Sequence, residues 1–170
     1  YAEAHSNLGV TLQEIGRLDE AEASLRQAIT LKPDFAEAHY NLGNTLQEPG
    51  SLDEAEASYR QAIAMKPDYA EAHSNLGNTL KELGRFDEAE ASYGQAIALK
   101  PDYAEAHSNL GNALKELGRL DEAEASYRQA IALKPDYADA HSNLGNTLKE
   151  LGRLDESISS YVRAINFKAD

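Results

Sequence analysis

Apolar side chains recur along this chain at intervals of three and four residues, and short breaks interrupt the pattern at regular points. Within residues 103–136 one apolar series covers positions 106–117 and a second covers positions 123–133. This spacing places each series on one face of an α-helix rather than on a strand. Gly118 lies between the two series and Pro135 follows the second, and both residue types end helices. The pattern therefore predicts two antiparallel helices of about three to four turns, joined by a tight glycine turn.

An Asp-x-x-Glu pair stands at each predicted helix start, as Asp102 with Glu105 and as Asp121 with Glu124. In this arrangement the aspartate side chain accepts hydrogen bonds from the free amides of the first turn, and the glutamate supports it. We therefore expect each helix to begin with an aspartate cap.

The same 34-residue frame occurs five times and accounts for all 170 positions. Residues 103–136 differ from residues 69–102 only at Thr79, Phe86 and Gly94. A fixed period of this length is typical of repeat proteins, in which two-helix units stack to share one elongated core. We expect an all-α fold that forms a single array over the whole chain. The five repeats are residues 1–34, 35–68, 69–102, 103–136 and 137–170.

A pattern of small, aromatic and proline residues recurs at fixed positions of the repeat. In the fourth repeat these positions are Leu110, Gly111, Ala123, Tyr127, Ala130 and Pro135. The pattern resembles the tetratricopeptide repeat family, and the resemblance covers the whole chain. It implies a right-handed superhelical solenoid, with the first helices on the concave surface and the second helices on the convex one. Glycine inside a helix costs about 1 kcal/mol against alanine, so we expect Gly111 to permit close helix approach, with Ala123 and Ala130 opposite.

The composition narrows the classes of partner. The formal net charge is −13, which disfavours binding to nucleic acid and to anionic membranes. The chain has no cysteine, and it carries neither a signal peptide nor a transmembrane stretch, so we expect a cytoplasmic protein without disulfides. Since the chain begins at Tyr1 rather than Met and has no distinct closing helix after Asp170, we expect it to be part of a longer protein.

Departures from the common repeat are informative because each repeat serves as a control for the others. Pro49 stands where the other repeats have an apolar residue, and it should fray the end of the first helix of its repeat. Gly94 replaces an arginine, which removes helix propensity and an ion pair with Glu90. Ile158 and Val162 replace a glutamate–arginine pair. They indicate either a covered apolar face or ordinary variation within the family.

One histidine recurs in every repeat, at His5, His39, His73, His107 and His141. Histidines one repeat apart should be separated by roughly one helix spacing, about 8–10 Å, which is too far for them to share a zinc ion. We therefore expect packing roles for them and no metal site. Catalysis needs unlike groups that converge in a closed pocket, whereas here the same groups recur in equal copies. The sequence predicts no catalytic residues, no cofactor and no enzyme activity.

Two rows of asparagine on the predicted first helices are the main candidate for a binding surface. The first row contains Asn7, Asn41, Asn75, Asn109 and Asn143. The second row contains Asn44, Asn78, Asn112 and Asn146. An asparagine amide offers a donor and an acceptor, which match the C=O and N–H groups of a peptide unit. The rows could thus hold an extended peptide; alternatively, the asparagines bond to neighbouring repeats or to water. The first row is similar to the row in the repeat arrays of O-GlcNAc transferases, which use it to hold protein substrates.

These features predict a protein–protein interaction scaffold that binds extended segments of partner proteins in its concave groove. Tyr40, which stands in a row of serines, is a candidate aromatic anchor. Acidic residues on the first helices favour partners that are neutral or basic. Two other functions stay open. The chain could recruit substrates for a larger transferase, or it could associate end to end with further copies of itself as a structural repeat.

Overall fold

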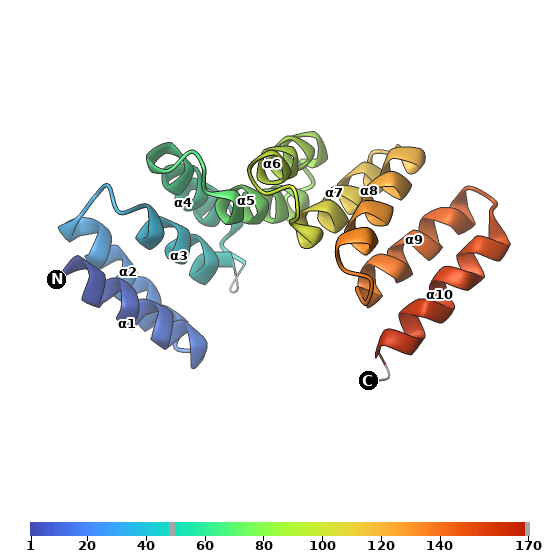
Figure 1. The fold of residues 1–170 in the computed structure, drawn as a ribbon. Coiled ribbons are helices and arrows are strands. Elements are labelled where there is room, and N and C mark those ends of the chain that lie inside the picture. The colour runs from blue at the N-terminus through green and yellow to red at the C-terminus, as the bar shows by residue number, and fades with distance from the viewer. Residues whose placement is uncertain (48–49, 169–170) are drawn as a thin grey trace. The chain divides into compact units, whose positions relative to one another are not determined.

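The structure is a computed structural model that describes residues 1–47 and 50–168. These residues form ten α-helices and no strands, which confirms the expected all-α fold. In chain order the helices are α1 (Ala2–Glu14), α2 (Leu18–Leu31), α3 (Ala36–Gln47), α4 (Leu52–Met65), α5 (Ala70–Glu82), α6 (Phe86–Leu99), α7 (Ala104–Glu116), α8 (Leu120–Leu133), α9 (Ala138–Glu150) and α10 (Leu154–Lys168) (Figure 1). Within the described ranges no helix combines the length and the apolar character needed to cross a bilayer. The predicted fraying at Pro49 lies outside the described residues.

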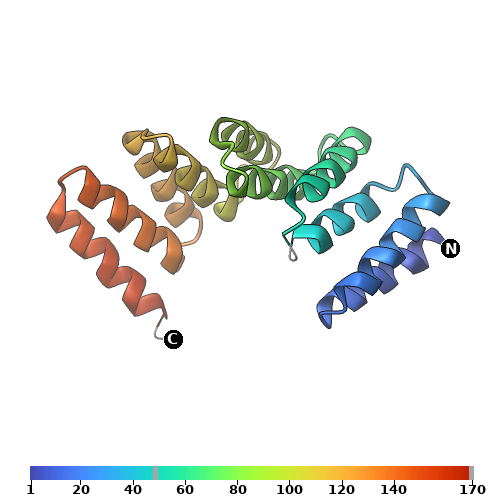
Figure 2. The same cartoon turned by 180° about the vertical axis from the view of Figure 1, so that it is seen from behind.

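Each 34-residue repeat contributes two helices, and the chain divides into two compact units, Tyr1–Gly84 and Arg85–Asp170. In the first unit α1 packs beside α2 and α3 beside α4. In the second unit α7 packs beside α8 and α9 beside α10 (Figures 1 and 2). Consecutive first helices also contact each other within a unit, as α1 does with α3 and α7 with α9. That all five repeats form a single array remains a prediction.

A glycine in the left-handed conformation ends the first helix of the repeat, as the sequence predicts. Gly118 has a φ of 75°. Its amide donates to the carbonyl of Lys115 at 2.9 Å, and the Arg119 amide donates to the carbonyl of Leu114 at 2.9 Å. The remaining turn glycines also have positive φ: Gly16, Gly50, Gly84 and Gly152. The two bonds form a Schellman motif, which satisfies carbonyls at the end of α7 and fixes the turn into α8.

The helices do not begin as the acidic pairs predict. Helix α8 begins at Leu120, which places Asp121 inside the first turn rather than before it. The N-cap residue is Arg119, and its side chain makes no capping hydrogen bond. Tyr103 caps α7, likewise without a side-chain bond. The prediction of aspartate caps is therefore wrong. Asp121 instead places negative charge in the first turn, where the positive end of the helix dipole favours it.

Gly111 allows the two helices of its repeat to pack around a tyrosine ring. A Cβ atom at Gly111 would lie 2.7 Å from Cε1 and 2.9 Å from Cδ1 of Tyr127, and the Tyr127 side chain is fully buried. The same pairing recurs as Gly43 with Tyr59 and Gly145 with Tyr161. The glycine does permit close packing, and the side chain nearest to it is that of Tyr127. At Gly9 the carbonyl oxygen of Ala21, the counterpart of Ala123, also lies 3.1 Å from a Cβ position, whereas a role of Ala130 opposite the glycine stays a prediction.

Two contacts hold the link between consecutive repeats, one from a histidine and one from a lysine. His107 Nε2 lies 3.1 Å from the carbonyl oxygen of Pro101. The Lys100 ammonium lies over the Tyr103 ring, 4.8 Å from its centroid, where the negative face of the ring attracts it. The same histidine contact occurs for His39 with Pro33, His73 with Pro67 and His141 with Pro135. These histidines thus connect each link to the first helix that follows it, and the group that each one contacts is the carbonyl oxygen of the proline in that link.

Candidate peptide-binding surface

Hydrogen bonds between side chains join the two asparagine rows. In the second unit the Tyr127 hydroxyl donates to Asn112 Oδ1 at 2.8 Å, and Asn143 Nδ2 donates to the same oxygen at 3.0 Å. The first unit contains the same arrangement, built from Asn44 Oδ1, the Tyr59 hydroxyl (2.8 Å) and Asn75 Nδ2 (2.9 Å). Each of these second-row oxygens is shared by a tyrosine of its own repeat and an asparagine of the next one. The alternative interpretation of the asparagines, as bonds between repeats, therefore applies to these four residues.

An amide oxygen can only accept a hydrogen bond, so the buried tyrosine hydroxyls are the donors in these bonds. The side chains of Tyr59 and Tyr127 are fully buried, and burial raises the pKa of each hydroxyl above its usual value of 10.0. Both hydroxyls therefore stay protonated at neutral pH and act as donors. The oxygens of Asn44 and Asn112 are consequently used as acceptors inside the protein.

The first row keeps hydrogen-bonding groups that the fold does not use. Asn75 and Asn143 donate through Nδ2 to the preceding repeat, while their Oδ1 atoms make no hydrogen bond to any described residue. The Asn41 amide bonds to nothing among the described residues, because Val10 stands where a second-row asparagine would accept. Asn7 is exposed and likewise has a free amide within the described part of the chain. The other members of the rows are engaged: Asn78, Asn109 and Asn146, whose oxygen accepts from the Tyr161 hydroxyl at 2.7 Å.

Tyr40 packs into an aromatic cluster of the first unit. Its ring centroid lies 4.8 Å from that of Tyr69 and 6.0 Å from that of Tyr59. Its hydroxyl accepts a hydrogen bond from Asn75 Nδ2 at 3.1 Å. The side chain is half-buried, so Tyr40 borders the first asparagine row and supports it while part of its ring stays accessible.

Acidic residues in the first turns of the first helices have basic partners. Lys134 Nζ lies 3.7 Å from Glu105 Oε1, and Lys168 Nζ lies 3.0 Å from Asp139 Oδ1. The matching pairs in the first unit are Lys32 with Glu3 at 3.6 Å and Lys66 with Glu37 at 3.8 Å. Exposed pairs of this kind are weak and are screened by salt. They reduce the local negative charge of this face without removing the chain's overall excess of acid.

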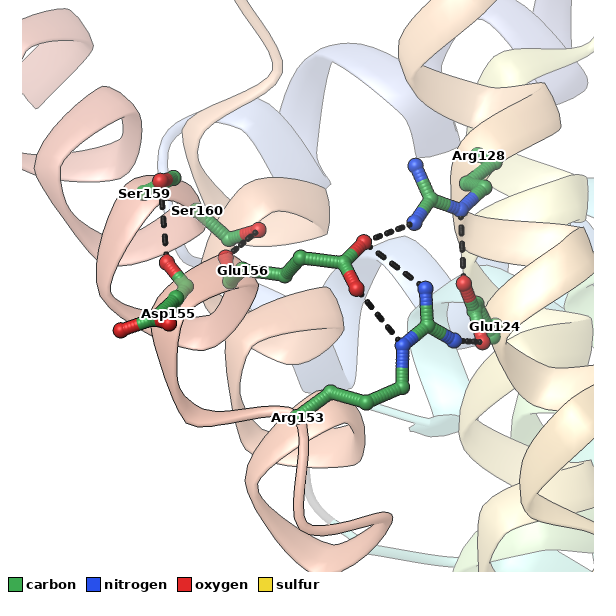
Figure 3. A network of polar contacts seen from close by, with 7 residues as sticks. All are labelled: Glu124, Arg128, Arg153, Asp155, Glu156, Ser159 and Ser160. Carbon is green, nitrogen blue, oxygen red and sulfur yellow. Dashed lines mark hydrogen bonds and ion pairs between the residues drawn. The ribbon is translucent and has the colours of Figure 1, made fainter.

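The second helices carry a network of ion pairs, of which the sequence predicts only some. The predicted pair between Glu124 and Arg128 is present, with 2.8 Å between Oε1 and Nε. In addition, Arg153 Nη1 lies 2.6 Å from Glu124 Oε2, and its Nη2 lies 2.7 Å from Glu156 Oε2 (Figure 3). Arg128 Nη2 also reaches Glu156 Oε2 at 3.2 Å, so two arginines share two glutamates across consecutive repeats. An arginine directly after the turn glycine is the sequence feature that could have indicated these additional ion pairs. It occurs at Arg17, Arg85, Arg119 and Arg153.

The surface offers non-covalent binding groups. Within residues 1–47 and 50–168, no three His, Asp or Glu side chains are arranged to hold a metal ion. Among the described residues the unused groups of the first row are the amide oxygens of Asn75 and Asn143 and the side-chain amides of Asn7 and Asn41. This arrangement is suited to hydrogen bonding with a polar backbone.

Paired helices, left-handed glycine turns and bonds repeated at a fixed interval define a helical repeat protein of the interaction-scaffold type. Two family models match the chain. The model described as TPR repeat matches residues 13–50, 48–84, 77–118 and 111–152, and the one described as Tetratricopeptide repeat matches residues 138–170. The chain belongs to the tetratricopeptide repeat family, which confirms the resemblance drawn from its sequence.

Solved structures of similar fold are numerous. A crystal structure of MamA is 25% identical and has a TM-score of 0.88, with 95% of this chain and 94% of that chain covered. YrrB, described as a TPR protein with an unusual peptide-binding site, is 25% identical with a TM-score of 0.82, covering 100% of this chain and 88% of that chain. The Pseudomonas aeruginosa protein pilF is 22% identical with a TM-score of 0.89, covering 98% and 76%, and shows the fold alone. No curated protein shows significant sequence similarity to this chain.

Proposed function

We propose that this protein is a non-catalytic scaffold that binds extended segments of partner proteins along the first asparagine row. The observation that carries the proposal is the state of the amides in that row. Asn75 and Asn143 are held by donor bonds to the preceding repeat, and their Oδ1 atoms remain unused among the described residues. Because the amide orientation is already fixed, a peptide N–H can bond to these oxygens without a further ordering cost. Asn7 and Asn41 add free amides at the start of the row.

The spacing of the row favours one peptide conformation. Within each unit consecutive first helices contact each other, and packed helices lie about 8–10 Å apart. A polyproline II segment rises about 3.1 Å per residue and repeats every three residues, which amounts to about 9 Å. One residue in three would therefore meet an asparagine of the row. An extended β-strand has a period of two residues and would present alternate faces to successive asparagines.

Two further points support the proposal. YrrB has a similar fold and is described as having a peptide-binding site. The net charge of −13 favours segments that are neutral or basic, by raising their rate of encounter. Tyr40 lies beside Asn75 and would contact the segment through the accessible part of its ring.

The test is a titration with a fluorescent proline-, alanine- and lysine-rich peptide of about nine residues, long enough to meet Asn7, Asn41 and Asn75 within the first unit. We expect the Asn41→Ala variant to bind this peptide about two- to tenfold more weakly, since one hydrogen bond is worth about 0.5–1.5 kcal/mol. Asn41 is the cleanest position because its side chain makes no hydrogen bond to a described residue. Fluorescence anisotropy measures the affinity.

A matched control is Gln129→Ala on α8, which removes an exposed amide from a second helix. Both variants should keep the parent's helical circular dichroism spectrum. Equal affinity of the parent and the Asn41→Ala variant would contradict the role of the row, and a loss with Gln129→Ala would place binding on the second helices.

Exposed apolar side chains favour self-association as a second candidate function. On α10, Ile158, Val162 and Ile165 are 61%, 51% and 67% exposed. On α1, Leu8 is 49% exposed. We propose that α10 of one copy packs on α1 of another, as α2 packs on α3 within the first unit.

This association is tested by restoring the charges that other repeats carry at the same positions. We expect the parent to show a mass that rises with concentration in multi-angle light scattering. The Ile158→Glu and Val162→Arg double variant should stay monomeric, since it reproduces the Glu124–Arg128 pair. A parent that remains monomeric at high concentration excludes the association.

A further inference from the structure

A hollow of about 570 Å³ opens beside Gly94 on the face formed by α6, α7 and α8. Its apolar floor is formed by Leu110 and Leu114, and Glu90 and Glu122 line its sides. A Cβ atom at Gly94 would meet nothing within 4 Å. We call this hollow the Gly94 notch. It lies on the second helices and contains none of the asparagines of the two rows, so it is independent of the peptide-binding proposal.

An arginine fills the counterpart of the notch one repeat further along. Arg128 stands 34 residues after Gly94, above Leu144 and Leu148. Its guanidinium lies between Glu124, at 2.8 Å, and Glu156, at 3.2 Å (Figure 3). The hollow that remains there is about 360 Å³, smaller than the Gly94 notch. The fold of the repeat therefore forms a binding site for a guanidinium group. In the fourth repeat the side chain of Arg128 occupies this site.

The first repeat contains the same guanidinium site, and an arginine side chain of the chain itself again fills it. Arg26 Nε lies 2.7 Å from Glu22 Oε1, and Arg26 Nη2 lies 2.7 Å from Glu54 Oε2. An arginine side chain thus fills this guanidinium site in two repeats, the first and the fourth.

The charges at the Gly94 notch are not balanced. In the filled copy two arginines, Arg128 and Arg153, share two glutamates. In the Gly94 notch the arginine that pairs with Glu90 and Glu122 is Arg119, at 2.6 Å from each, and neither carboxylate has a second arginine partner within residues 50–168. Hydrogen bonding to Arg119 lowers the pKa of Glu122, so that carboxylate is ionised at neutral pH. Compared with the fourth repeat, one positive charge is missing where the side chain of residue 94 would supply it.

We propose that the Gly94 notch binds an arginine side chain of a partner protein. The guanidinium lies between Glu90 and Glu122, and the methylene groups of the arginine cover Leu110 and Leu114. The planar fork of arginine bonds to two carboxylates at once, which the point charge of lysine does less well. The notch therefore gives the second-helix face a docking point for basic segments.

The test uses N-acetyl-L-arginine methylamide as the probe, titrated into ¹⁵N-labelled protein and followed by the amide signals of Gly94 and Ser126. The citrulline analogue is the control, because it has the same shape without the charge. We expect the arginine probe to bind about fivefold more tightly than the citrulline probe, in line with two exposed ion pairs. The Gly94→Ala variant should behave like the parent because it leaves the notch open.

Two variants with opposite expected effects decide the proposal. Gly94→Arg should abolish the arginine-dependent shifts, because the chain then fills its own notch. Arg128→Gly should open a second notch and add arginine-dependent shifts at Ser160. The proposal is overturned if both probes give equal shifts in the parent, or if Gly94→Arg leaves the arginine shifts unchanged. Gly94→Arg restores the residue type of the other repeats, so the decision stands even if Arg128→Gly fails to fold.

Discussion

Replacing Gly111 with alanine is expected to lower the free energy of unfolding by about 1–3 kcal/mol, although alanine is the better helix former. The added Cβ would lie 2.7 Å from Cε1 of Tyr127. Since the Tyr127 ring is fully buried, it cannot move aside without displacing its neighbours. Chemical denaturation followed by circular dichroism measures the change.

The matched control is Gly94→Ala, in another helix of the same chain. No atom lies within 4 Å of the position of a Cβ there, so the helix propensity of alanine should raise the free energy of unfolding by about 1 kcal/mol. The same glycine-to-alanine substitution is thus expected to lower the free energy of unfolding at Gly111 and to raise it at Gly94. A stabilising effect at Gly111 would mean that the ring of Tyr127 is not held as tightly as its burial indicates.

The second large effect is expected at Asn112, whose Oδ1 accepts from both the Tyr127 hydroxyl and Asn143 Nδ2. Asn112→Ala removes the acceptor of a fully buried hydroxyl, and the unsatisfied group should cost about 1–3 kcal/mol of unfolding free energy. Thermal or urea unfolding monitors this loss.

Asn146→Ala serves as the internal control for Asn112→Ala. Asn146 is exposed, and among the described residues its oxygen accepts from the Tyr161 hydroxyl alone, so its replacement should cost less than about 1 kcal/mol. In the double variant Asn112→Ala with Tyr127→Phe the effects should be less than additive, because both changes break the same bond. Fully additive effects would contradict the hydrogen bond between Tyr127 and Asn112.

Much of the fold could be predicted because the relevant signals are local and occur five times. The spacing of apolar residues gives the helices, and a glycine such as Gly118 marks each turn through a backbone conformation that other residues avoid. The pairs at i,i+4, such as Glu124 with Arg128, follow from helix geometry alone.

Most of what the sequence does not predict depends on a partner in another helix or repeat. Sequence spacing does not show which side chain fills the space left by a glycine, so the contact between Gly111 and Tyr127 is not predicted from the sequence. The asparagine rows were identified as candidates, but the bond from Asn143 to Asn112 depends on how one repeat packs on the next. The aspartate caps failed because α8 begins at Leu120, one residue before the predicted cap.

The bonds between repeats also bear on how such a chain can change its length. The Asn44–Asn75 and Asn112–Asn143 bonds both join residues 31 positions apart, and the Arg26–Glu54 and Arg128–Glu156 pairs both join residues 28 positions apart. Unequal recombination between two near-identical copies removes or duplicates a whole 34-residue block and leaves both separations unchanged at the new junction. A gene of this kind can therefore gain or lose repeats in one step, without compensating substitutions, and an unusual member such as Gly94 can be carried intact to a new position in the array.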